Sequence, residues 1–281
     1  MTMNDQNITS TDALQAIARD LRMDILKATS KAGSGHLSSS FSSVELLTAL
    51  FFNGLLRYRP EEPLWPERDR FIMSKGHAAP LLYAVLARAG YIPRDDLWRL
   101  REVSSPVQGH PVLGDLPGIE ATTGSLGQGI SLGIGHILGG RLTGKQFRVY
   151  VLIGDGECQA GQIWESAMAA AHHKTHELMV IMDYNKYQEM GPVSREMALE
   201  PLADKWQAFG WQTLEVDGHN IHDVTKGIKT LQKVTGKPSI LIAHTVKGKG
   251  VSFVEQDYTW HGRAITNPQQ YQQAEKELLC S

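Results

Sequence analysis

The stretch VLIGDGECQAGQIWESAMAA, residues 151–170, passes from an apolar run through a Gly-Asp-Gly turn into a helical pattern. Similar β-branched-rich runs appear in RVYVLI, ELMVIMD, WQTLEV and PSILIAHT, and helix-like stretches at about residues 159–173 and 221–235 lie between them. Strands that alternate with helices indicate a parallel β-sheet with helices on both faces. The sequence therefore predicts an α/β fold, with ligands expected beyond the carboxyl ends of the strands.

The amino-terminal part of the chain predicts a helical layer ahead of this sheet. Residues 11–32 have apolar side chains at helical spacing and end at the glycines of AGSGH. A second helix is predicted from Ser42, because Ser42 and Glu45 have the spacing of a capping box, and a third near 79–89. Residues 91–122 predict irregular chain with one short helix. We expect residues 1–281 to form a single domain with this helical layer at its amino terminus.

Composition limits the classes of function. The chain has 281 residues, 42% of them hydrophobic, and a formal net charge of -2, with basic residues scattered along it. This charge balance argues against nucleic acid or an anionic membrane as a partner. The start MTMNDQNITSTDALQ does not read as a signal peptide, and no apolar run is long enough for a spanning helix. Cys158 and Cys280 form no metal-ligand pattern, which favours a cytoplasmic protein, with Cys158 as a small buried residue.

Two polar residues follow predicted strands directly. Asp155 comes after VYVLI and Asn185 comes after LMVIMD, so one carboxylate and one amide oxygen meet at the same edge of the sheet. Magnesium prefers such oxygen ligands, and the carbonyl of Tyr187 could supply a third. Gly154 and Gly156 allow a ligand to approach the turn closely. The turn alone fits a capping aspartate as well as a metal ligand.

A second glycine-rich element favours the metal. In TTGSLGQGISLGIGHILGG, residues 122–140, a Gly-Ser-Leu-Gly turn runs into a predicted helix. Such a turn presents backbone N–H groups and the positive end of a helix to an anion. Gly129 and Gly133 also predict that this helix packs closely on a neighbour. Together with the Gly-Asp-Gly turn, the element indicates a diphosphate held by magnesium, although the glycines alone could serve packing.

Four histidines lie beside glycine in loops: His36, His77, His110 and His261. Histidine titrates near neutral pH and can donate or accept a proton, which suits chemistry around a carbonyl and hydroxyls. A single histidine of this kind is more often structural, but four in one chain predict a site. His172, His173 and His176 lie on the predicted helix and turn after Glu165, and we expect no catalytic role for them.

Taken together, these motifs resemble transketolase. The resemblance rests on motifs that occur in order along nearly the whole chain: SGH (34–36), SKGHA (74–78), GHP (109–111), TGSLGQG (123–129), GDGE (154–157) with WE (164–165), DYNK (183–186), HTVKGKG (244–250) and WHG (260–262). It covers only the amino-terminal, diphosphate-binding domain of that enzyme, which has the thiamine-diphosphate-binding (PP-type) fold. Because the sequence ends shortly after WHG, it is similar to the amino-terminal subunit of a split transketolase.

The resemblance implies cofactors and residue roles. Magnesium, or calcium or manganese in its place, would be bound by Asp155, Asn185 and the carbonyl of Tyr187. Contacts to thiamine diphosphate are implied for His77, Gly124, Ser125, Leu126, Gly156, Glu157, Asn185, Lys247 and His261. The implied catalytic residues are His36, His77, His110 and His261, and Arg263 stands where a basic residue is common near the mouth.

The implied reaction is transfer of a two-carbon ketol unit from a ketose phosphate to an aldose. The resemblance assigns the glutamate that activates the cofactor, and most groups that bind the sugar phosphate, to a partner subunit with the pyrimidine-binding and carboxyl-terminal domains. An α2β2 heterotetramer is expected, with the isolated chain inactive.

Two positions depart from the usual transketolase pattern. Ala160 stands where glutamate is usual, which puts carboxylate coupling between active sites in doubt although Glu165 is retained. LSSS follows His36 where proline or glycine is common, which points to a less common sugar.

Three alternatives remain from the sequence. Deoxyxylulose-phosphate synthase and the α chain of 2-oxoacid dehydrogenases share the Gly-Asp-Gly turn and a distant asparagine, but SKGHA and TGSLGQG favour transketolase. A non-catalytic cofactor-binding or regulatory subunit would keep the fold alone. A nucleotide-binding phosphotransferase would need a GxxxxGK[ST] loop, which the sequence lacks.

Overall fold

The computed structural model describes residues 10–280, and its centre is a parallel sheet of five strands in the order β1-β2-β3-β5-β4. The strands are β1 (Arg70–Met73), β2 (Val149–Gly154), β3 (Leu178–Tyr184), β4 (Gln212–Asp217) and β5 (Ser239–His244). Every neighbouring pair is parallel, and the central register aligns Gly154 with Asp183. The predicted α/β fold is confirmed, and all strands end at one edge of the sheet.

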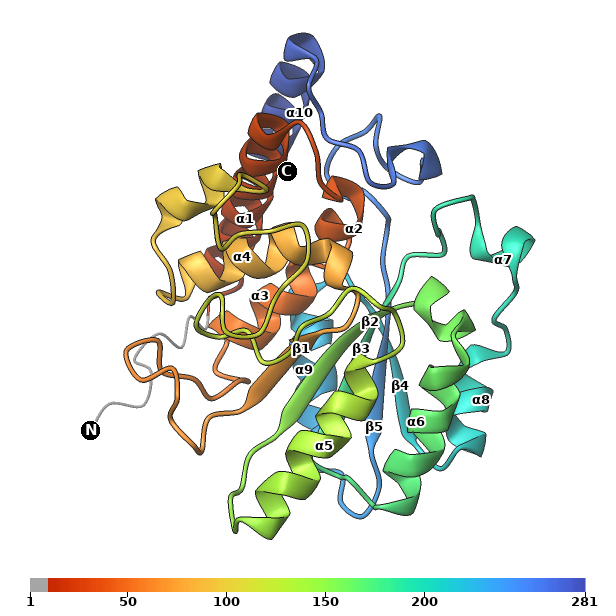
Figure 1. Cartoon of the computed structure of the whole chain (residues 1–281). Helices are drawn as coiled ribbons and strands as arrows, with labels where there is room; N and C mark the ends of the chain where they lie inside the picture. Colours follow the sequence, from red (N-terminus) through yellow and green to blue (C-terminus); the bar gives the residue numbers. More distant parts are fainter. Residues whose placement is uncertain (1–9, 281) are drawn as a thin grey trace.

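Helices cover both faces of this sheet (Figure 1). One face belongs to a hydrophobic core that also contains residues of α1 (Thr11–Ala32), α2 (Leu37–Phe41), α3 (Val44–Phe52), α4 (Ala79–Arg88), α9 (Ile221–Leu231) and α10 (Pro268–Cys280). The other packs on α5 (Gly129–Leu142), α6 (Gly161–His172) and α8 (Leu202–Ala208). Alternate strand residues feed the two cores: Tyr150 and Leu152 belong to the first, and Val149 and Val151 to the second. The remaining short elements are α7 (Val193–Glu196) and the 3-10 helices η1 (Gly76–Ala78), η2 (Arg94–Arg99), η3 (Gly156–Gln159) and η4 (Tyr258–Trp260).

The predicted amino-terminal helical layer is present. α1 ends where Gly33 takes a left-handed conformation (φ 64°) and its N–H returns to Ser30. α4 and its stop before Gly90 also match, and η2 is the one short helix between residues 91 and 122. The prediction that the starting segment holds no signal peptide falls mainly on residues 1–9, which lie outside the described part of the chain. Of the helices in residues 10–280, none is both long and apolar enough to cross a membrane.

The predicted capping box at Ser42 is wrong. The amino-terminal cap of α3 is Ser43, and its side chain makes no capping hydrogen bond. Ser42 Oγ donates instead to the carboxylate of Asp183, and Glu45 accepts from Arg22 and contacts His219. Glu45 is buried, so its charge needs partners from other elements more than the helix end needs a cap. A tertiary contact has overridden a local motif.

Helix α5 lies close against the sheet because of its glycines. A Cβ on Gly129 would lie 2.4 Å from Ser74, and one on Gly133 would lie 3.2 Å from Leu178 and Val149. The close packing predicted for this helix is therefore confirmed, and the start of α5 is held near the end of β1. Cys158 is buried as predicted and both cysteines are free thiols.

Candidate active site

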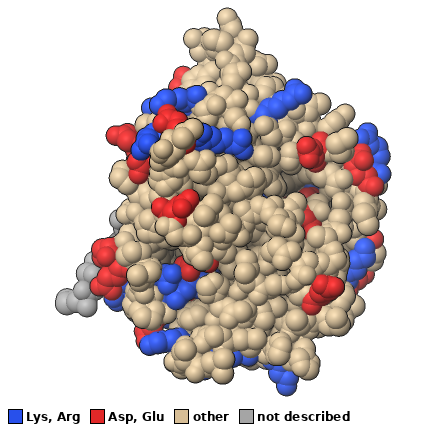
Figure 2. Space-filling view, viewed as in Figure 1, with Lys and Arg blue, Asp and Glu red and all other residues tan. Residues whose placement is uncertain are grey.

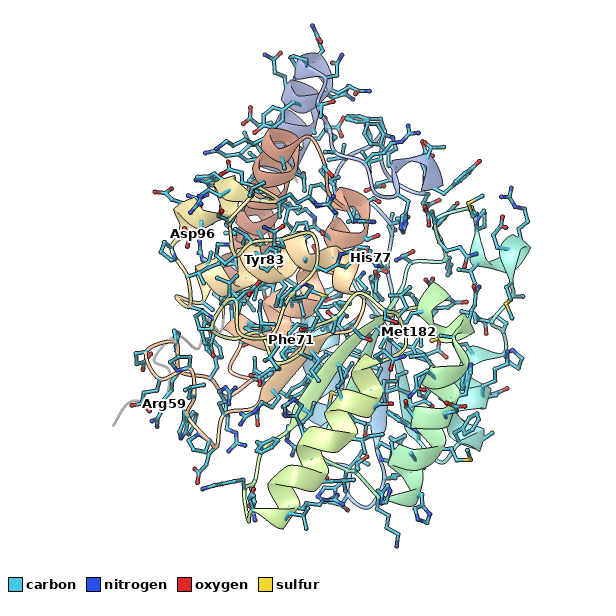
Figure 3. The ribbon with its side chains drawn as sticks, viewed as in Figure 1. Arg59, Phe71, His77, Tyr83, Asp96 and Met182 are labelled. Atoms are coloured by element: carbon cyan, nitrogen blue, oxygen red, sulfur yellow. The ribbon has the colours of Figure 1, made fainter. Side chains whose placement is uncertain are left out.

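A cavity of about 430 Å³ lies beyond the carboxyl ends of β2 and β3. It brings together most of the predicted site residues: His36, His77, Gly124, Leu126, Asp155, Gly156, Glu157, Asn185, Tyr187, Lys247 and His261. Figure 3 shows His77 beside α2, past the ends of the central strands. The surface is hollowed on the right of the view in Figure 2, with acidic side chains inside the hollow and along its margin.

Three residues that the sequence pointed to lie outside the cavity lining: Ser125, His110 and Arg263. Ser125 is exposed on the glycine-rich turn beside Gly124. His110 is exposed too, and its ring lies so close to Gly124 that a Cβ there would be 3.1 Å from it. Arg263 is also exposed, next to His261 and Gly262. These residues therefore border the cavity at its mouth, and the other predicted ones form its walls.

Asp155 and Asn185 are buried at neighbouring strand ends. Asp155 accepts hydrogen bonds from the backbone N–H groups of Gly156, at 2.7 Å, and Lys186. Burial, and then the nearby carboxylate of Asp183, raise the pKa of Asp155 to about 7. Asn185 Oδ1 accepts from the N–H of Tyr187 at 3.1 Å. A carboxylate that is buried with so few donors fits a divalent cation, because a cation would stabilise its charged form.

The glycine-rich turns have the shape that a diphosphate needs. Gly124 has φ 153°, and a Cβ on Gly76 would lie 2.7 Å from the backbone of Thr123. A Cβ on Gly156 would lie 3.2 Å from Gln188. Side chains at these positions would fill the space between the turns, so the cradle exists because glycine occupies them.

Glu157 joins the two turns. Its carboxylate accepts from the N–H of Gly127 at 2.8 Å and the N–H of Gly154 at 3.0 Å, and from Ser74 Oγ at 2.5 Å. Burial raises the pKa of Glu157, and these hydrogen bonds oppose the shift. Glu157 thus holds the two turns of the pocket wall together. Its contact to the cofactor stays a prediction.

Three histidine rings cluster in the lining of the same cavity. The ring centroids of His36 and His77 are 4.9 Å apart, those of His36 and His261 5.2 Å, and those of His77 and His261 5.5 Å. Burial is the main cause that lowers the pKa of His36 to about 4, that of His261 to about 3, and that of His77 well below its usual value. All three rings are therefore neutral at pH 7. His36 Nδ1 is buried and has no hydrogen-bond partner among residues 10–280.

Lys247 determines which nitrogen of His261 carries the proton. Its buried Nζ lies 3.0 Å from His261 Nδ1, and burial followed by the charge of Lys75 lowers the pKa of Lys247 to about 8. At neutral pH the ammonium can only donate, so Nδ1 must accept and the ring proton must sit on Nε2. His261 is therefore set as a donor through Nε2.

The motifs did not single out several residues of this site. Ser39 and Lys75 line the cavity, as do Gln188, Glu189 and Met190. Lys75 was visible in SKGHA and Ser39 in LSSS, but the loop after Asn185 carries no chemical signal in the sequence. Arg101 was also missed: its guanidinium donates to Ser34 Oγ at 2.6 Å, and its charge lowers the pKa of both His36 and His110 after burial.

A larger cavity of about 640 Å³ contains none of the predicted residues. It is lined by Arg57, Arg141 and Glu177 among others, and His176 lies there too. Arg141 is bound to Glu177 and to the carbonyls of His173 and Lys174. The basic groups of this cavity are thus largely engaged by protein, and the smaller cavity is the better candidate.

A parallel sheet with a glycine-rich turn and a buried acid at the carboxyl ends of its strands is the arrangement of the thiamine-diphosphate-binding α/β class. The family described as "Transketolase, thiamine diphosphate binding domain" matches residues 11–278. The chain therefore belongs to the transketolase family.

Individual relatives agree with this assignment. An apulose-4-phosphate transketolase subunit of Phocaeicola vulgatus is 38% identical over 267 residues, which are 95% of this chain and 94% of the relative. The 6-deoxy-6-sulfo-D-fructose transketolase subunit SqwG of a Clostridium species is 41% identical over 253 residues, 90% of this chain and 92% of the relative. The crystal structure of transketolase from Campylobacter jejuni has a TM-score of 0.90 at 29% identity, and covers 96% of this chain. This chain spans only 43% of that longer one.

Proposed function

We propose that this chain is the thiamine-diphosphate-binding subunit of a two-chain transketolase, which transfers a two-carbon ketol unit from a ketose phosphate to an aldose. The observation that carries the proposal is the extent of the similarity. The chain covers 94% and 92% of two relatives that are themselves transketolase subunits, but 43% of a long transketolase chain. The proposal includes residues 1–281 as one domain, supported by two cores that share a single sheet.

The cavity residues fit thiamine diphosphate with magnesium, or with calcium or manganese in its place. Asp155, Asn185 and the carbonyl of Tyr187 would bind the cation, and the turns around Gly124 and Gly156 would hold the diphosphate. Lys247 and His77 add a buried ammonium and a neutral ring to the same cavity. When bound, thiamine diphosphate supplies the carbon nucleophile and the electron sink of the reaction.

The histidines would handle protons at the sugar oxygens. His261 can donate from Nε2 because Lys247 holds its Nδ1, and His36 keeps a buried nitrogen without a partner among residues 10–280. His110 lies at the mouth, where a longer substrate would pass it. A general acid or base contributes about 10²–10⁴-fold to a rate. Neutral rings suit this work at pH 7, because they can donate from one nitrogen and accept at the other.

The partner would be a second subunit with the pyrimidine-binding and carboxyl-terminal domains, in an α2β2 heterotetramer in the cytoplasm. The similarity to relatives named as subunits supports a partner. These relatives act on apulose 4-phosphate and on 6-deoxy-6-sulfo-D-fructose, by their names. We therefore propose a ketose donor with an anionic phosphate or sulfonate group, and the exposed Arg101 and Arg263 are basic groups of this chain near the cavity mouth.

The test is reconstitution. The chain is purified alone and with its co-purifying partner, and both samples are assayed with thiamine diphosphate, magnesium and a panel of ketose phosphates and sulfonates. Transfer is expected from the complex alone. Activity of the rigorously purified single chain would contradict the two-chain proposal, and pyruvate decarboxylation by the complex would favour the 2-oxoacid dehydrogenase alternative.

A further inference from the structure

Asp183, near the end of β3, is fully buried beneath the cavity and does not line it. Its carboxylate meets side chains from four segments that surround the end of β3. Ser42 Oγ donates at 2.6 Å and Asn185 Nδ2 at 2.8 Å, and shorter contacts come from Lys75 Nζ and Thr245 Oγ1. Ser42, Lys75 and Asn185 share one oxygen, and Thr245 takes the other. Asp183 is thus held in one orientation by its own donors.

The contact with Asn185 has a chemical consequence. The two ends of an asparagine amide have nearly the same shape, so packing alone does not decide which end points where. An ionised carboxylate can only accept, however, so the amide nitrogen must face Asp183. The oxygen then lies on the other side, where it accepts from the N–H of Tyr187 at 3.1 Å, beside the carboxylate of Asp155 in the cavity lining.

We propose that Asp183 is a positioning residue that fixes the amide of Asn185, so that its oxygen and not its nitrogen faces the bound cation. The inference rests on the proposed function, because it assigns the same cation to the same cavity. An amide turned the other way would point N–H groups at a divalent cation, and such groups cannot bind it. Lys75 and Thr245 serve this arrangement by holding the carboxylate itself in place. Hydrogen-bonded partners of metal ligands typically contribute about 10–100-fold to metal affinity.

A rival explanation is that Asp183 and Lys75 form an ion pair for stability alone. Two double variants separate the explanations, because both remove the ion pair and only one of them keeps an acceptor that can face Asn185. The leucine variant also removes the acceptor of the Ser42 and Thr245 hydroxyls, and the melting temperatures measure the cost of that loss. Lys75→Met with Asp183→Asn keeps an amide oxygen that can accept from Asn185. Lys75→Met with Asp183→Leu leaves no acceptor there, and replacing both members of a buried pair by apolar groups often preserves folding.

The measurement is the dissociation constant of Mn²⁺, followed by electron paramagnetic resonance, in the two-chain complex with thiamine diphosphate present. We expect the leucine double variant to bind Mn²⁺ at least about tenfold more weakly than the asparagine double variant. Equal affinities would overturn the inference. Melting temperatures of both complexes check folding, and Lys75→Met with Asp183→Ala replaces the leucine variant if that one does not fold.

Wild type and Asp155→Ala distinguish this inference from the proposed function. Binding of Mn²⁺ by wild type that is lost in Asp155→Ala assigns the cation to this cavity. With that result, equal affinities of the two double variants contradict the role of Asp183 only. Binding in wild type that survives Asp155→Ala would overturn the proposed cation site and the role of Asp183 together.

Discussion

Asp155 and Asp183 lie at the ends of adjacent strands, and both are buried, yet their environments differ completely. Asp183 receives four side-chain donors, one of them the ammonium of Lys75. Asp155 receives two backbone N–H groups. Burial raises the pKa of Asp155 to about 7. Burial also acts to raise the pKa of Asp183, but the charge of Lys75 and the hydrogen bonds from Lys75, Ser42 and Thr245 together outweigh it and lower that pKa to about 2.

The difference shows how the role of a buried carboxylate can be inferred from its hydrogen-bond donors. Desolvation acts on both carboxylates, so the donors decide which one is stable as a charged group. Where protein donors satisfy the charge, the acid belongs to the framework. Where they do not, the acid suits a cation that arrives from solution. Substitutions at the two sites should therefore have opposite effects on stability.

The largest effect on stability is expected when Asp183 loses its partner Lys75. Lys75→Met removes the cation that faces Asp183 and should lower the free energy of unfolding by about 3–5 kcal/mol, because it leaves a buried charge without its partner. Urea unfolding followed by tryptophan fluorescence measures it. The matched control is Arg88→Met, which breaks the exposed pair with Asp20 and should cost less than about 1 kcal/mol. Similar losses in the two variants would break the comparison.

A substitution of Asp155 is expected to increase stability. Because the pKa of Asp155 is raised from 3.8 to about 7, its charge destabilises the cofactor-free fold above pH 7. Asp155→Asn should then raise the free energy of unfolding by about 2–4 kcal/mol at pH 8, since raising a pKa by one pH unit corresponds to about 1.4 kcal/mol. It should also abolish stabilisation by thiamine diphosphate with magnesium.

The pH dependence of the stability difference between Asp155→Asn and wild type tests whether the charge of Asp155 causes it. Below about pH 4 the carboxyl of Asp155 is protonated in both folded and unfolded chains, so the variant and wild type should not differ. Between about pH 4 and about pH 7 only the unfolded chain loses this proton, so the advantage of Asp155→Asn should grow across that window and level off above it. A constant advantage at every pH would point to packing and not to charge.

A smaller effect, on the rate of ketol transfer, is expected at His261. There Lys247 pairs with a histidine ring and not with a carboxylate. His261→Ala should lower ketol transfer by the complex by about 10²-fold, because one donor is lost from the reacting oxygens. Cofactor affinity is measured in parallel by fluorescence. Unchanged transfer with the cofactor bound would favour the alternative of a regulatory, non-catalytic chain.

The smallest effect is expected from adding an acid. Ala160→Glu restores the usual carboxylate of the family at the amino-terminal cap of α6, where a negative charge contributes about 0.3–1 kcal/mol. We expect cofactor affinity to stay within about twofold. Titration of the complex with thiamine diphosphate shows whether the two sites become cooperative, and a large loss of affinity would show that Ala160 is required for the pocket.

Sequence reasoning succeeded where chemistry and periodicity coincide. Gly-Asp-Gly after an apolar run predicted the place of Asp155. Of the four histidines beside glycine, three meet in the cavity, and His110 lies outside its lining. Sequence reasoning failed for β1, because four buried residues are too short to show a period. It also failed at Ser42 and Lys75, whose partners lie 141 and 108 residues away along the chain. Contacts of this length depend on the finished fold, and no local pattern encodes them.

Glu157 couples the motions of the two glycine-rich turns of the pocket. One carboxylate holds the N–H of Gly127 on one glycine-rich turn and the N–H of Gly154 on the other. Because the same side chain would have to leave both amides, opening of either turn is linked to opening of the other. The two amides should then exchange their hydrogens with deuterated water at one common rate, as parts of a single clasp.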